Sequence, residues 1–89
     1  KKATVSNAVL GISSWSFDAA ALSKAVRAVS SSRSAGVMVS WDGTDPTATL
    51  GHPILTNLSI SVLGNENIQA LEFIREAGVD AEVTITLET

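Results

Sequence analysis

Two stretches of the chain alternate between apolar and polar side chains, over residues 57 to 63, where only Val62-Leu63 breaks the pattern, and over residues 81 to 88. A period of two places every second side chain on the same face of a β-strand. The pattern therefore predicts two half-buried strands. The side chains expected to point inward are Leu58, Ile60 and Val62 in the first strand, and Val83, Ile85 and Leu87 in the second. Of these, we expect Ile60, Val62, Val83 and Ile85 to be buried and to face one another across a sandwich.

Other strands are predicted around this pair. Val37, Met38 and Val39 form an apolar run with turn formers on both sides, which indicates a strand over residues 36 to 41. Residues 3 to 14 are rich in β-branched side chains and predict a strand with a bulge or bend at Gly11. Residues 30 to 36, which are mostly serine, predict a loop.

Two stretches permit either helix or strand. Residues 18 to 32 fit a helix capped by Asp18, and they also fit a short helical turn at 18–22 followed by a strand at 24–31, which we favour. Residues 68 to 77 fit a two-turn helix capped by Asn65 or Asn67, or a turn at 65–69 followed by a strand at 70–76. Helices at both places would give an α+β domain in the order β-α-β-β-α-β.

The count of short strands, six or seven with frequent turn signals, favours an all-β fold. We expect one domain over residues 1–89, a small antiparallel β-sandwich of jelly-roll type. We expect at most a short helical turn, near residues 18–22 or 65–69. Trp15 and Phe17 would share a face of an extended segment and are interpreted as core anchors.

Residues 40 to 53 form the segment with the densest turn signals, and they are expected to connect the strand at 37–39 with the strand at 58–62. Asx bonding, positive φ at glycine and the fixed φ of proline each shape such a connection. Gly43, which follows Asp42, is expected to have a positive φ. The structural residues of this loop are Asp42, Gly43, Thr44, Asp45, Pro46, Gly51 and Pro53.

Composition and charge narrow the classes of partner. The 89 residues carry a formal net charge of −3. Proteins that bind nucleic acid need clustered Lys and Arg, so we expect no nucleic-acid partner. The chain has no cysteine and no apolar run long enough to span a membrane. Its first residue is Lys, so we expect that the initiator methionine or a longer leader was removed. Charged residues make up only 17%, which suits a protein whose faces are covered by other protein.

The search for catalytic or metal-binding chemistry finds weak signals only. His52 is the one histidine and is interpreted as a hydrogen-bonding loop residue, since a zinc site would lack ligands. Asp42 and Asp45 have too few acidic neighbours for a calcium cage, and Asx turns explain them. Glu72 and Glu76 have no evident acid–base partner. We expect no enzymatic activity, no metal and no cofactor.

From Gly36 onward the chain resembles small structural proteins of tailed bacteriophages. The most distinctive element is the run Asp42-Gly43-Thr44-Asp45-Pro46-Thr47, and residues 24 to 29 fit more loosely. In such proteins the stretch that matches residues 71 to 74 is a strand. The segments that carry the resemblance are Trp41 to Thr49, Gly51 to Pro53, Gly64 to Ile68, Leu71 to Ile74 and Asp80 to Thr86.

The resemblance implies a virion protein that decorates or cements the capsid, or a small head or tail subunit. It implies self-association, a trimer by analogy with three-fold capsid sites, and contacts with capsid or tail proteins. Apart from the resemblance, the charge of Lys1 and Lys2 and the aromatic rings of Trp15 and Trp41 make these residues candidates for an interaction surface. The protein would be made in the bacterial cytoplasm. Two alternatives are a carbohydrate- or ligand-binding β-module that uses Trp41 or Trp15, and an accessory domain like the protease-associated domains, with helix–strand pairs at 19–41 and 67–87.

Overall fold

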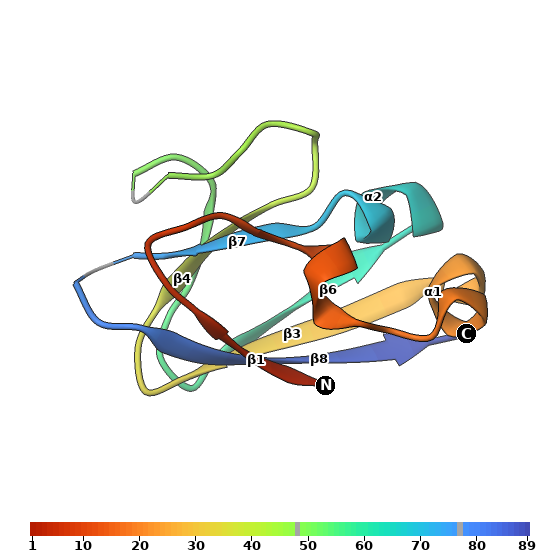
Figure 1. Cartoon of the computed structure of the whole chain (residues 1–89), viewed down its shortest axis with the longest axis horizontal. Coiled ribbons are helices and arrows are strands. Elements are labelled where there is room, and N and C mark those ends of the chain that lie inside the picture. Colours follow the sequence, from red (N-terminus) through yellow and green to blue (C-terminus); the bar gives the residue numbers. More distant parts are fainter. Residues whose placement is uncertain (48, 77) are drawn as a thin grey trace.

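The computed structural model describes residues 1–47, 49–76 and 78–89, and it contains two four-stranded antiparallel sheets (Figure 1). Sheet A has the order β1-β8-β3-β6, and sheet B has the order β2-β7-β4-β5. The fold class is therefore an all-β sandwich. The strands are β1 (Lys2–Val5), β2 (Leu10–Gly11), β3 (Arg27–Arg33), β4 (Val37–Ser40), β5 (His52–Ile54), β6 (Ser59–Leu63), β7 (Glu72–Arg75) and β8 (Ala81–Glu88).

The strands pair as one long hairpin that is rolled up on itself. β4 pairs with β5, β3 with β6, β2 with β7 and β1 with β8, and these nested pairs alternate between the two sheets. Further ladders between β3 and β8 and between β4 and β7 join the pairs into two sheets. This winding is that of a jelly roll. The prediction of a jelly-roll-like sandwich is confirmed.

In the described part of the chain, helical structure is limited to short segments. They are the helices α1 (Ala19–Lys24) and α2 (Asn65–Gln69), and a 3₁₀ turn at Ile12–Trp15. Asp18 caps α1, because its carboxylate accepts a hydrogen bond of 3.3 Å from the Ala21 N–H. The predicted helical turns are present, and the α+β alternative is excluded. Within the described ranges, no helix is long and apolar enough to cross a membrane.

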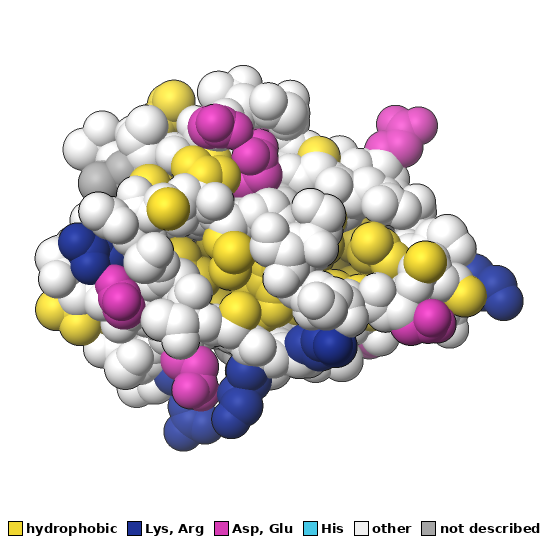
Figure 2. Space-filling model, viewed as in Figure 1, with side chains coloured by type: hydrophobic (Ala, Val, Ile, Leu, Met, Phe, Trp, Pro, Cys, Tyr) yellow, Lys and Arg dark blue, Asp and Glu magenta, His cyan; other side chains and the backbone are white. Residues whose placement is uncertain are grey.

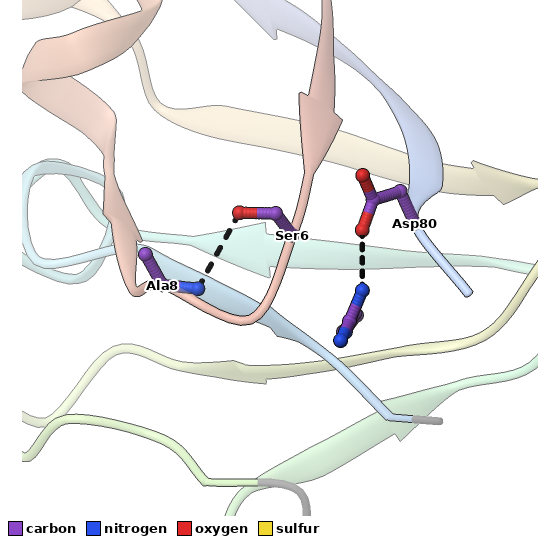
Figure 3. Close-up of polar contacts among 4 residues, drawn as sticks. Ser6, Ala8 and Asp80 are labelled. Atoms are coloured by element: carbon purple, nitrogen blue, oxygen red, sulfur yellow. Dashed lines mark hydrogen bonds and ion pairs between the residues drawn. The ribbon is translucent and has the colours of Figure 1, made fainter. Parts of the chain in front are cut away.

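The N-terminal segment was predicted as one bent strand, and this is wrong. β1 belongs to sheet A and β2 to sheet B, so the chain crosses between the sheets at residues 6 to 9. The Arg75 N–H donates to the Ser6 carbonyl at 3.0 Å, and the Ser6 hydroxyl accepts from the Ala8 N–H at 3.4 Å. Figure 3 shows the second contact beside the ion pair of Arg75 with Asp80, 2.7 Å long. The bond from the Arg75 N–H to the Ser6 carbonyl ties the crossing segment to β7.

The strand that follows residues 40–53 also differs from the prediction. β5 lies between β4 and β6 in the chain and is the hairpin partner of β4, whereas β6 belongs to the other sheet. Val62 is buried and Ile60 is half-buried, but Leu58 precedes the strand and is 54% exposed. β6 and β8 lie in the same sheet on either side of β3, so their apolar side chains share one face and do not oppose each other.

The core fills the space between the sheets. Val83 and Ile85 of β8 and Phe73 of β7 are fully buried. Figure 2 shows hydrophobic side chains along the middle of one face of the molecule, with Lys, Arg, Asp and Glu around its rim. The loop predicted at residues 30 to 36 is wrong in its first half, because β3 continues to Arg33 and buries the side chains of Ser30 and Ser32.

Candidate functional site

The loop at residues 41–51 joins β4 to β5 and projects from sheet B (Figure 1). Its first half is a turn held by side chains. The Asp42 carboxylate accepts a hydrogen bond of 3.0 Å from the Thr44 N–H, and the Ser40 hydroxyl donates to the Thr44 carbonyl at 2.6 Å. Gly43 has a φ of +87°, as predicted for a glycine after aspartate in such a turn. The predicted Asx turn is therefore confirmed.

The second half of the loop returns the chain to the sheet. Thr47 and Leu50 exchange backbone hydrogen bonds of 2.9 and 3.2 Å, and the side chain of Pro46 is buried. Gly51 has a φ of +133°, and an added Cβ there would lie 3.1 Å from the Val39 carbonyl oxygen. Pro53 was predicted as a loop residue, but it lies in β5, the edge strand of sheet B. Proline has no N–H to donate, and an edge strand tolerates this because its outer side pairs with no other strand.

We predict that Gly51→Ala destabilises the protein more than Gly43→Ala. Both glycines have a positive φ, and strain of this kind costs about 1 to 3 kcal/mol. Only Gly51 adds a close contact with backbone, because a Cβ on Gly43 meets nothing within 4 Å. Denaturant unfolding of both variants measures the difference. Equal losses would contradict the close approach of Gly51 to β4.

An open cleft of about 410 Å³ lies against this loop. The Trp41 indole stacks on the His52 imidazole, with ring centroids 4.4 Å apart and planes 14° from parallel. Asp42, Asp45 and the 55% exposed Leu50 line the same cleft. His52 was interpreted as a hydrogen-bonding loop residue, and the structure instead places it at the start of β5 with its ring on Trp41.

Carboxylates gather beside the cleft. A hydrogen bond with the Asp45 side chain, burial, and the negative charges of Asp45 and Asp42 raise the pKa of Glu72 above its ordinary value. A carboxyl group whose pKa is raised on folding binds its proton more tightly in the folded state than in the unfolded state. Protonation of Glu72 therefore stabilises the folded protein as the pH falls. Such a site disfavours anionic ligands and suits neutral, hydroxyl-bearing ones. Among the described residues, no three His, Cys, Asp or Glu side chains are arranged to hold a metal ion.

The residues predicted as an interaction surface do not lie together. Trp15 is 4% exposed, so it is a core residue and offers no platform for a partner. Lys1 and Lys2 are exposed at the beginning of β1, an edge strand of sheet A. The terminal amino group donates to the Ile85 carbonyl at 2.7 Å, and the Lys2 Nζ lies 3.9 Å from the Glu82 Oε1. Trp41 follows β4 of sheet B and is half-buried. The structure thus leaves Trp41 as the aromatic residue at the candidate site.

Several contributors to the site were not predicted as site residues: Ser40, Leu50 and His52 in the cleft lining, and Glu72 beside it. The register of β4 with β5 brings His52 to Trp41, because His52 pairs with Val39 and Trp41 lies two residues beyond Val39. Without this register the sequence does not show that the two rings meet. Glu72 comes next to the loop because β7 pairs with β4, which places it opposite Ser40.

No family model, no curated protein and no solved structure matches the chain. A function for this protein is therefore proposed from its fold, from the geometry of the loop and from the resemblance of its sequence.

Proposed function

We propose that the protein is a non-enzymatic structural component of a tailed-bacteriophage virion, which decorates or cements the capsid or forms a small head or tail accessory subunit. The observation that carries this proposal is the jelly-roll winding of the chain, an architecture used by viral capsid proteins and by lectins. The resemblance of residues 41–53 and 64–86 to phage structural proteins adds to it.

The surface is consistent with a protein that is covered in its assembly. Only 17% of the residues are charged, and among the residues that the structure describes seven large apolar side chains are more than a third exposed. Removing apolar area from water stabilises a contact by about 25 cal/mol per Å². We propose that the chain self-associates and docks on capsid or tail proteins, and that it reaches the virion after synthesis in the bacterial cytoplasm.

Purification of intact virus particles tests this function. We expect the protein to sediment with full particles through a density gradient, at a constant copy number per particle that matches a symmetry of the capsid or tail. Particles that assemble and infect normally without a trace of the protein would contradict the proposal.

A second candidate function is binding of a carbohydrate in the cleft beside Trp41. The observation that favours it is the pairing of an aromatic side chain with the Asp42 and Asp45 carboxylates, which accept hydrogen bonds from sugar hydroxyls. A volume of about 410 Å³ lies within the usual range of ligand pockets. Lectins also use the jelly roll.

Tryptophan fluorescence during glycan titration tests the second function. Trp15 is buried, so a bound sugar would quench Trp41. We expect Trp41→Phe to abolish the quenching and Trp15→Phe to preserve it. A glycan array on which the protein binds nothing would exclude this function and leave the virion proposal standing.

A further inference from the structure

The sandwich has four edge strands, and three of them are protected against pairing with another chain. The edges are β1 and β6 in sheet A, and β2 and β5 in sheet B. β2 has only two residues, β5 contains Pro53, and β1 carries the charge of Lys2. Short length, proline and lysine are the usual means by which edges are blocked. β6 has none of them.

The free edge of β6 presents backbone groups to solvent. At the two ends of its ladder with β3, the Ser32 N–H donates to the Leu58 carbonyl and the Gly64 N–H donates to the Val26 carbonyl. Since an antiparallel ladder alternates, the even-numbered residues bond to β3 and the odd-numbered ones face away. Ser59, Ser61 and Leu63 therefore direct N–H and C=O groups outward. The Leu63 carbonyl accepts a bond of 3.0 Å from Asn67 and keeps a second lone pair.

The side chains along this edge are uncharged. No Asp, Glu, Lys or Arg occurs between residues 46 and 65, a stretch that contains β5, β6 and their connection. Leu55, Leu58 and Leu63 in the same stretch are 53%, 54% and 63% exposed. Two such edges approach each other without repulsion between like charges, and they remove apolar side chains from water.

We propose that β6 pairs antiparallel with β6 of a second copy of this chain, about a two-fold axis through Ser61. In this register Ser61 faces Ser61 of the second copy, and Ser59 faces Leu63 in both directions. The outward N–H and C=O groups then bond each other, and the two copies of sheet A become one continuous sheet of eight strands. The same strand serves on both sides, which is the condition for a closed, symmetric dimer.

This inference does not rest on the proposed virion function, and it replaces the trimer that the capsid analogy suggested. Sedimentation equilibrium of the isolated protein tests it directly. We expect a mass twice the 9.2 kDa of the chain. A monomer at every concentration, or a trimer, would overturn the proposal, whether or not the protein is found on virions.

Charge substitutions at the centre of the pair give a matched test. Ser61→Lys places two like charges opposite each other, so we expect the mass to fall two-fold, to that of the monomer. Thr86→Lys adds the same charge to an exposed residue of β8, away from the edge, and the dimer should persist. Mixing Ser61→Lys with Ser61→Asp should restore a dimer that contains one copy of each. A Ser61→Lys variant that stays dimeric would overturn the register.

A cysteine probe keeps the test valid if a charged variant fails to fold. The chain has no cysteine, so one introduced thiol is unique. Residues that face each other in a hydrogen-bonded antiparallel pair lie about 5.5 Å apart at Cα, which is within reach of a disulfide. Under mild oxidation Ser61→Cys should form a covalent dimer rapidly, and Thr86→Cys should not. Equal rates of cross-linking would show that β6 is not the contact.

Discussion

Ile85→Ala is expected to lower the free energy of unfolding by about 2 to 5 kcal/mol. Ile85 is fully buried near the middle of β8, the strand that pairs with both β1 and β3. Loss of three side-chain carbons there leaves a cavity that the two neighbouring strands hold open. The close packing of protein interiors makes such a cavity costly.

Thr86→Ala serves as the control for this substitution. Thr86 is the next residue of β8 and is exposed on the outer face of sheet A, so its replacement changes strand propensity but not the core. We expect a loss below about 1 kcal/mol. Urea unfolding monitored by circular dichroism compares the two variants. Similar losses for both would contradict the assignment of Ile85 to the core.

Trp15→Ala should be among the most destabilising single changes, with a loss of about 3 to 5 kcal/mol. The indole has two aromatic neighbours: its ring centroid is 5.6 Å from that of Phe73 and 6.4 Å from that of Phe17. It thus joins the 3₁₀ turn to the centre of sheet B. A loss below about 1 kcal/mol, measured by denaturant unfolding, would contradict this role.

Trp15→Phe separates the packing of the ring from its polar group. The Trp15 Nε1–H is buried and has no acceptor among the described residues. An unmade hydrogen bond of this kind costs about 1 to 3 kcal/mol, and phenylalanine removes it together with part of the ring. We therefore expect Trp15→Phe to lose clearly less stability than Trp15→Ala. Equal losses would show that the size of the indole, and not its aromatic contacts, matters most.

The strands that were predicted correctly have a side-chain pattern that their burial explains. β8 has one face on the core and the other toward solvent, so the alternation from residue 81 to 88 is almost complete. The N-terminal segment has a β-rich composition throughout, although its two strands belong to different sheets. Composition indicates extended structure, but only contacts between distant residues, such as Arg75 with Ser6, decide where the chain changes sheets.

β5 was missed because it is short and carries signals for a turn. It has three residues, His52, Pro53 and Ile54, and proline beside a glycine is typical of loops. Position at the edge of the sheet removes the usual penalty for proline in a strand. The alternation that predicts β6 extends one position too far, because Leu58 belongs to the turn that the Leu58 N–H closes with the Leu55 carbonyl at 3.0 Å.

The candidate site was predictable in its local geometry and not in its assembly. The Asx turn at Asp42 and the positive φ of Gly43 depend on neighbours in sequence, and both follow from residue type. The Trp41–His52 stack and the approach of Glu72 to Asp45 depend on strand pairing. Local patterns contain no information on which strands become neighbours.

The nested winding of the strands also sets an order in which the protein folds. Successive pairs join residues that are farther apart in the chain, and the entropy lost on closing a loop grows with that distance. The separation is 13 residues for Val39 with His52, 28 for Ser31 with Ser59, 61 for Gly11 with Glu72 and 82 for Lys2 with Thr84.

We therefore expect folding to begin at the β4–β5 hairpin and to end when β1 joins β8. Topologies with so many distant contacts fold on the order of milliseconds to seconds. Ala3→Gly in β1 should then speed unfolding and leave the folding rate unchanged, because its contacts form after the transition state. Stopped-flow measurements at several denaturant concentrations give both rates, and we expect only the unfolding rate to change. A slower folding rate would show that β1 already pairs with β8 in the transition state.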